Sequence, residues 1–234
     1  MGSALPVVLL PGMDGSAELR RDIAERLSIA RPVVIIAYPA DRPMGYSDLV
    51  CYVRSRLPQG PFIILGESFS GPIAIEIAAS EPRAAGLVLV SSFASAPLPS
   101  FLARFTGVLT FKRAFRHSIE VVLMGACAPQ ALKLQLRKAL SEVRGEVLTK
   151  RAKETLRVDA LPALKRVVVP VLCLAGRFDQ LIGKSSVRRI VAASPKAHVC
   201  WFDAPHMLLQ MCPAEAAVEI NNFCGLLSPR TCTV

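Results

Sequence analysis

The sequence predicts an α/β fold in which a reduced, mostly parallel sheet of about six strands carries helices on both faces. Six short runs of Val, Ile and Leu recur without polar alternation, as is typical of parallel strands that are buried on both faces. The segments between most of them are long enough for right-handed crossover helices. With 234 residues, 52% of them hydrophobic, the chain suffices for one medium-sized core. The apolar runs cover residues 6–10, 33–38, 62–66, 87–91, 171–176 and 199–202.

Five of the intervening segments have the pattern of helices, and no repeat, linker or low-complexity tract interrupts them. The expected helices cover residues 17–27, 46–57, 73–80, 186–193 and 213–227. We therefore expect one α/β core formed by residues 1–92 and 163–234.

The long interval between the fourth and fifth strands breaks this alternation. It spans about eighty residues, far more than an ordinary connection. Residues 93–162 are therefore predicted to form a helical insertion that covers the carboxyl edge of the sheet, where open parallel sheets bind ligands. Such a lid would exclude water and hold a hydrophobic substrate. The alternative is a set of ordinary core helices without a lid role. One apolar series at helical spacing comprises Leu132, Leu136, Leu140, Val143 and Val147, and a second comprises Phe93, Leu98, Phe101, Leu102, Phe105, Leu109, Phe111 and Phe115.

Composition excludes several other classes of protein. No apolar run approaches the roughly 20 residues that span a bilayer, and the amino terminus lacks the pattern of a signal peptide. The seven cysteines are odd in number and lack paired metal-ligand spacing. We therefore expect a cytoplasmic protein without a metal site or an organic cofactor.

The third apolar run leads directly into a candidate nucleophile. The residues Gly66-Glu67-Ser68-Phe69-Ser70-Gly71 connect this run to a helical pattern. A strand, a tight turn and a helix in this order hold a serine on a strained turn, and small residues must flank it. Ser70 occupies the fifth position, where the usual pattern has Gly, and Gly71 follows one place later.

A serine hydroxyl needs a base within hydrogen-bond reach and a third group that orients the base. Ser68, Asp179 and His206 follow one another in the order nucleophile, acid and base, and the last two come directly after predicted strands. Asp203 is the alternative acid, although it shares a loop with His206. Of the other histidines, His198 is expected to be structural, and His117 lies in the insertion.

A tetrahedral intermediate also needs two preorganised N–H donors. We expect one from the backbone of Phe69, directly after the nucleophile. The second is expected from the backbone of Met13, because Gly12 and Gly15 allow the loop after the first strand to turn its amides inward.

Together these segments resemble the α/β-hydrolase superfamily. The resemblance rests on residues 66–71, the loop 11–15, Gly176-Arg177-Phe178-Asp179 and Pro205-His206, and it extends from residue 7 to about residue 227. It implies the α/β-hydrolase fold without the usual amino-terminal hairpin. Within the superfamily, the size of the chain and the placement of the lid are similar to small carboxylesterases and to the pimeloyl-acyl-carrier-protein methyl ester esterases of biotin synthesis.

The excess positive charge is concentrated in the predicted insertion. The net charge is +10, and residues 112–157 contain eleven basic residues against four glutamates. A basic lid beside an apolar tunnel would attract an acidic acyl carrier protein or an anionic lipid surface, although a solvated helix face explains the charge equally well. Nucleic-acid binding is not expected. The basic residues are Lys112, Arg113, Arg116, Lys133, Arg137, Lys138, Arg144, Lys150, Arg151, Lys153 and Arg157.

The expected function is hydrolysis of a carboxylic ester through an acyl-enzyme, with a small-molecule or carrier-linked acyl ester as substrate. A thioesterase, acyltransferase or perhydrolase with the same triad is the main alternative, and a non-catalytic binding protein of this fold is a further one. The oligomeric state is left open. Substrate contacts are expected from Phe93, Phe101, Phe105, Leu123, Arg116, Lys133, Arg137 and Lys138.

Overall fold

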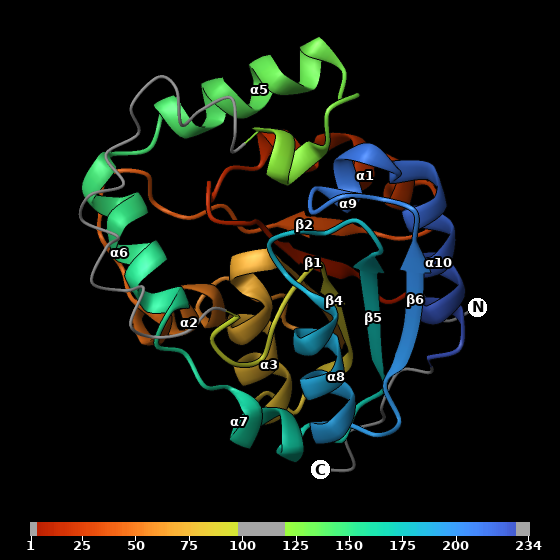
Figure 1. Cartoon of the computed structure of the whole chain (residues 1–234). Helices are drawn as coiled ribbons and strands as arrows, with labels where there is room; N and C mark the ends of the chain where they lie inside the picture. The colour runs from red at the N-terminus through yellow and green to blue at the C-terminus, as the bar shows by residue number, and fades with distance from the viewer. Residues whose placement is uncertain (1–3, 98–119, 228–234) are drawn as a thin grey trace.

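The computed structural model describes residues 4–97 and 120–227 and contains one six-stranded sheet (Figure 1). The strand order is β2-β1-β3-β4-β5-β6, and every neighbouring pair is parallel. This confirms the predicted fold class. The strands are β1 (Val7–Leu10), β2 (Val33–Ile35), β3 (Phe62–Glu67), β4 (Ala84–Val90), β5 (Val171–Gly176) and β6 (His198–Phe202).

The strand order reverses direction between β1 and β3. The chain passes from β1 outward to β2 and then returns to place β3 on the other side of β1. In open parallel sheets, the crevice at such a switch point is the usual ligand site, at the carboxyl ends of the strands. Leu10 at the end of β1 pairs with Gly66 near the end of β3. The loop after β1 and the turn after β3 are therefore neighbours.

Helices cover both faces of the sheet because side chains alternate along each strand. Val8 and Leu10 face a core layer shared with α2, α3, α7 and α8. Val7 and Leu9 face the opposite layer, shared with α1, α9 and α10. These helices are α1 (Arg21–Ser28), α2 (Tyr46–Arg54), α3 (Gly71–Ser80), α7 (Leu161–Arg166), α8 (Lys184–Ala193), α9 (Leu208–Met211) and α10 (Pro213–Gly225).

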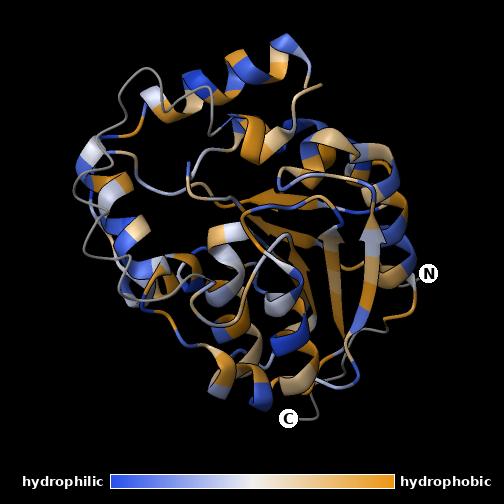
Figure 2. Ribbon diagram, in the orientation of Figure 1, coloured by the Kyte–Doolittle hydropathy of each residue, from blue (hydrophilic) through white to orange (hydrophobic). Residues whose placement is uncertain are grey.

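Two helices of the predicted insertion, α5 (Gln130–Ser141) and α6 (Gly145–Thr155), lie outside these layers (Figure 1). The arrowheads of β5 and β6 point toward the side of the molecule where α5 lies. Leu136 of α5 joins a small apolar cluster with Leu19 and Met207, which attaches the insertion to the core. Figure 2 shows mixed hydrophobic and hydrophilic residues along α5 and α6, whereas the strands are largely hydrophobic. The five apolar residues predicted at helical spacing do not share one helix: Leu132, Leu136 and Leu140 lie on α5, Val147 lies on α6, and Val143 lies in the turn at residues 142–144 between them.

Some predicted boundaries were wrong. The expected strand 33–38 ends at Ile35, and the expected helix 17–27 is divided into the short 3-10 helix η1 (Glu18–Arg20) and α1. The break falls at Arg20, whose backbone leaves the helical region and whose side chain is buried. Within the described part of the chain, no helix is both long and apolar enough to span a membrane.

Gly66 generates the first prediction, because the sharp turn after β3 leaves no room for a side chain at this position. A Cβ on Gly66 would lie 2.6 Å from the carbonyl oxygen of Ser70 and 2.8 Å from the Cβ of Ala74. Gly66→Ala should therefore lower the free energy of unfolding by about 1–3 kcal/mol, the usual cost of overpacking. The matched control is Gly60→Ala, since a Cβ there meets no atom within 4 Å. Urea denaturation of both variants measures the difference, and equal stabilities would contradict the steric argument.

Candidate active site

Ser68 lies on the turn between β3 and α3, in a conformation that its side chain disfavours. Its φ angle is +50°, in the left-handed region, where a residue other than glycine costs about 1–3 kcal/mol. The Ser68 carbonyl accepts a 2.6 Å hydrogen bond from the hydroxyl of Ser92 on the loop after β4. Strain at a residue that the surrounding structure holds in place is a common property of functional sites.

His206 lies on the loop after β6 and contacts Ser68. Its Nε2 atom is 2.9 Å from the Ser68 Oγ, and the residue is 5% exposed. The next residue, Met207, donates its N–H to the carbonyl of Leu123 at 2.8 Å. The insertion therefore contributes directly to the position of the histidine loop.

Asp179 lies on the loop after β5 and holds the other nitrogen of the imidazole. The distance between its Oδ2 and the His206 Nδ1 is 2.8 Å. Its Oδ1 accepts hydrogen bonds from the backbone N–H groups of Leu181 at 2.9 Å and Ile182 at 2.8 Å. A carboxylate only accepts hydrogen bonds, so we assign the imidazole proton to Nδ1. Nε2 is then free to accept the hydroxyl proton of Ser68.

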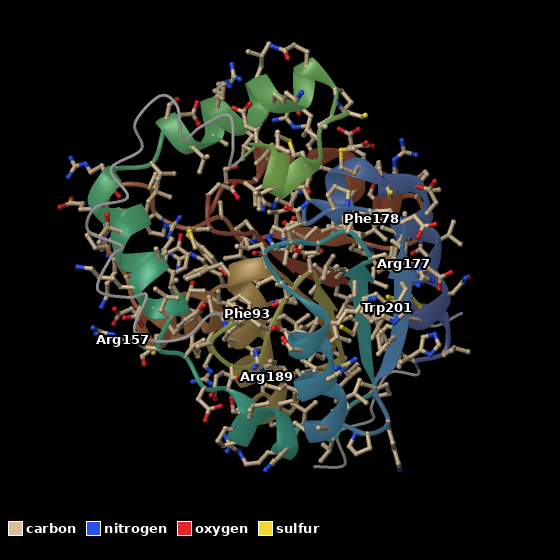
Figure 3. All side chains as sticks on the ribbon, viewed as in Figure 1. Phe93, Arg157, Arg177, Phe178, Arg189 and Trp201 are labelled. Atoms are coloured by element: carbon tan, nitrogen blue, oxygen red, sulfur yellow. The ribbon has the colours of Figure 1, made fainter. Side chains whose placement is uncertain are left out.

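The alternative acid, Asp203, and the histidine His198 do not contact the candidate site. The side chain of Asp203 is 78% exposed and forms an ion pair with Arg177 at 3.0 Å. In Figure 3, Arg177 and Phe178 lie together beside the carboxyl end of β5. His198 was expected to be a satisfied structural histidine, but it is exposed at the first position of an edge strand. His117 lies outside the described residues.

The loop after β1 adjoins the turn at Ser68, as the pairing of Leu10 with Gly66 requires. Gly15 closes a turn by donating its N–H to the Gly12 carbonyl at 3.0 Å, and the Gly15 carbonyl accepts from the Tyr38 N–H at 2.8 Å. Among the described residues, the N–H of Met13 has no acceptor. The roles of Met13 and Phe69 as oxyanion donors stay predictions.

Ser70, which replaces the usual glycine, connects the turn to the loop after β1. Its hydroxyl donates a short hydrogen bond to the Pro11 carbonyl. The Tyr38 hydroxyl lies 2.5 Å from the Ser70 Oγ, whose proton is already given to Pro11, so Tyr38 donates and Ser70 accepts. Burial raises the pKa of Tyr38, which keeps its phenol protonated. The departure from the motif therefore supplies a cross-link that glycine cannot form.

A buried ionic cluster, which sequence reasoning missed, lies behind the same loop. The Arg20 side chain donates to Glu67 at 2.5 Å and to both carboxylate oxygens of Asp14 at 2.5 and 2.6 Å. Gln210 of α9 donates to the other Glu67 oxygen at 3.0 Å. This cluster therefore joins the loop after β1, the residue before Ser68 and the helix after the histidine loop. Nothing in the sequence pairs Arg20 with Glu67, because they are 47 positions apart.

Electrostatics keep Asp14 ionised in this cluster. Burial opposes the charge of Asp14, but Arg20 and the hydrogen bonds from Arg20 and Ser16 outweigh burial and lower the pKa of Asp14. Removal of one buried charge would leave its partner uncompensated. The cluster is therefore a rigid connection between segments that carry the candidate site.

The predicted substrate contacts are only partly described. Phe93 is 1% exposed and lies inside the molecule (Figure 3), while Leu123 is half-buried beside the cluster of Leu136 and Met207. On α5, Lys133 is half-buried, and Arg137 and Lys138 are exposed. Phe101, Phe105 and Arg116 lie outside the described residues. Contact of these eight residues with a substrate stays a prediction.

Ion pairing modifies the expected distribution of charge. Four basic residues of the insertion pair with its glutamates: Arg137 with Glu120, Lys138 with Glu142, Arg144 with Glu146, and Lys150 with Glu154. Arg151 was counted with the lid surface, but it is buried. Of the basic residues in the described part of the insertion, Lys133, Arg151, Lys153 and Arg157 have no ion pair. Within residues 4–97 and 120–227, no three His, Cys, Asp or Glu side chains gather into a set that could hold a metal ion.

Comparison with known proteins identifies the family. The sequence profile of the Alpha/beta hydrolase family matches residues 7–220, so the chain belongs to this family. A search of curated protein sequences found no significant match.

Solved structures show the same fold at low sequence identity. An enol-lactonase from Burkholderia xenovorans LB400 matches with a TM-score of 0.83 and 17% identity over 96% of this chain and 92% of that one. An esterase from Exiguobacterium antarcticum matches with a TM-score of 0.84 and 15% identity over 96% and 93% of the two chains. For a bromoperoxidase from Bacillus anthracis the TM-score is 0.86, with 15% identity over 96% and 93%. The family supports a hydrolase, and these likenesses support the fold.

The Ser70 cross-link gives the second prediction. Ser70→Ala would leave the buried Pro11 carbonyl and Tyr38 hydroxyl without their shared partner, at a cost of about 1–3 kcal/mol in the free energy of unfolding. Tyr38→Phe should lower the free energy of unfolding less in the Ser70→Ala background than in the wild-type protein, because the phenol has already lost its partner there. Denaturation of both single variants and the double variant measures the coupling energy. Additive losses would show that the two hydroxyl groups do not act together.

Proposed function

We propose that this protein is a serine hydrolase that cleaves carboxylic esters through an acyl-enzyme. The observation that carries the proposal is the unbroken line of hydrogen bonds from the Ser68 Oγ through both nitrogens of His206 to Asp179. Ser68 is the nucleophile, His206 the base and Asp179 the group that orients the imidazole. Membership of the Alpha/beta hydrolase family supports the same class of reaction.

The first half-reaction forms the acyl-enzyme. The Ser68 oxygen attacks the ester carbonyl while its proton passes to the His206 Nε2. The backbone N–H groups of Met13 and Phe69 stabilise the resulting oxyanion. The imidazolium then returns the proton to the departing alkoxide, so an alcohol leaves and the acyl group stays on Ser68.

The second half-reaction releases the acid. His206 takes a proton from a water molecule, whose oxygen attacks the acyl carbonyl, and the imidazolium then returns the proton to the Ser68 oxygen as the acid leaves. Asp179 keeps the Nδ1 proton in place in both steps and balances the charge of the imidazolium. No other proton carrier is needed.

Residues 93–162 are proposed to act as the lid, and their apolar side chains favour an acyl chain over a sugar or a peptide. The helix α5 contains Lys133, Arg137 and Lys138 and no acidic residue, which favours an acidic carrier of the acyl group. A pimeloyl-acyl-carrier-protein methyl ester is one substrate of this kind.

Hydrolysis of a thioester, or acyl transfer to an acceptor other than water, is the second candidate function, because the same triad serves thioesterases, acyltransferases and perhydrolases. The structural neighbours include a protein described as a bromoperoxidase as well as an esterase. Product analysis with water, alcohol or hydrogen peroxide as the competing acceptor distinguishes these reactions. A binding protein without catalysis would have no need of the hydrogen-bonded triad.

The third prediction concerns the triad. Ser68→Ala should abolish both labelling by a fluorophosphonate and hydrolysis of p-nitrophenyl esters. Asp179→Asn should lower kcat by about 10⁴-fold, because an amide stabilises the wrong tautomer of the imidazole. Asp203→Asn is the matched control and should leave kcat unchanged, since Asp203 contacts Arg177 and not His206. A folded wild-type protein whose Ser68 resists labelling would refute the proposed function.

The fourth prediction concerns the carrier. Lys133→Glu with Lys138→Glu should raise KM for esters linked to an acyl carrier protein and leave KM for short soluble esters unchanged. Arg137 is kept because it binds buried Glu120. The control carries the same charge reversal at exposed Lys165 and Lys196, which precede β5 and β6 at the opposite end of the sheet. Equal effects on both classes of ester would exclude a carrier site on α5.

A further inference from the structure

Arg151 reaches from the insertion into the candidate active site. It belongs to α6, yet it is only 1% exposed. Its Nη1 donates to the carbonyl of Met13 at 2.7 Å, and its Nη2 donates to the carbonyl of Pro39 at 2.9 Å. The guanidinium therefore joins the insertion to the loop that carries the proposed oxyanion donor.

The guanidinium packs directly against the backbone of this loop. Gly15 has a φ angle of +73°, and a Cβ there would lie 2.6 Å from the Arg151 Nη1. The guanidinium carbon lies 5.6 Å from the centre of the Tyr38 ring, and the Tyr38 N–H holds the carbonyl of Gly15. Arg20 takes a similar place on Gly12, where a Cβ would lie 2.6 Å from the Arg20 Nη2. The loop is thus packed between two arginines.

Burial of the Arg151 guanidinium costs more free energy than a purely structural contact would justify. Burial lowers the pKa of Arg151, and its hydrogen-bond partners are neutral carbonyls. Its Nε is buried without a partner. A well-packed apolar side chain would often stabilise the fold at least as well as a buried charge. The guanidinium is therefore better explained by a role in the site than by a contribution to stability.

We propose that Arg151 is a positioning residue for the oxyanion donor at Met13, an inference that rests on the proposed function. Arg151 fixes the carbonyl of Met13, while the loop turn and Tyr38 fix the backbone on either side. The N–H of Met13 stays without an acceptor and is held ready for the negative oxygen of the tetrahedral intermediate. Preorganisation of this kind makes such a donor effective. Because Arg151 belongs to α6, the insertion is part of the catalytic apparatus.

The test compares Arg151→Met and Arg151→Lys with Lys150→Met, a matched control on the same helix whose side chain is half-exposed and paired with Glu154. Arg151→Met should lower kcat for a short soluble ester by about 10- to 100-fold, up to the loss seen when one oxyanion donor is removed. KM should stay unchanged. Affinity for a boronic acid that forms a tetrahedral adduct with Ser68 should fall by the same factor. Arg151→Lys should recover part of both losses, because an ammonium group keeps the charge and one hydrogen bond.

Thermal unfolding of each variant separates positioning from folding. A folded Arg151→Met enzyme with wild-type kcat and boronate affinity would overturn the inference, and so would a loss confined to KM or shared by Lys150→Met. If Arg151→Met does not fold, Arg151→Lys provides the test. Wild-type kcat together with wild-type boronate affinity in Arg151→Lys would then overturn the inference. Failure of the proposed function is distinct, since the wild-type protein would then show no turnover that depends on Ser68.

Discussion

The rest of the structure depends on the parallel pairing of β1 with β3. Because Leu10 lies opposite Gly66, the loop that follows β1 and the turn that follows β3 emerge side by side at the switch point of the sheet. One segment carries the predicted oxyanion donor and the other carries Ser68. β5 and β6 end at the same edge, so Asp179 and His206 reach this point from the loops that follow them. Four loops meet there because parallel strands share one carboxyl edge.

Polar contacts hold these loops together where apolar packing cannot. Ser70 bridges the elbow to the Pro11 carbonyl, and Arg20 connects Asp14 with Glu67. Each bond is buried, so each would cost free energy if one partner were lost. Such cross-links favour one arrangement of the backbone, which compensates for the strained conformation of Ser68. Stability is spread through the two apolar layers, whereas these few polar residues fix the geometry of the site.

The insertion is joined to the site through its backbone and its side chains. Leu123 accepts a hydrogen bond from the residue after His206, and Arg151 holds the loop at Met13. A movement of the insertion would therefore displace the loop that carries His206 and the loop that carries Met13. Ion pairs partly neutralise the basic surface of the insertion, and the Arg151 side chain is buried in the interior.

The sequence alone determined the class of fold, the order of the strands along the chain and the candidate triad. Apolar runs and strand-end loops are local patterns, and the order Ser68, Asp179, His206 can be recognised without coordinates. Tertiary structure brings Asp179, and not Asp203, into contact with the imidazole, because distance to the imidazole depends on how two loops fold over the sheet. It also decided the roles of Arg20, Arg151 and Ser70. Their partners are distant in sequence, and neither charge nor hydropathy distinguishes an arginine that will be buried from one that will face solvent.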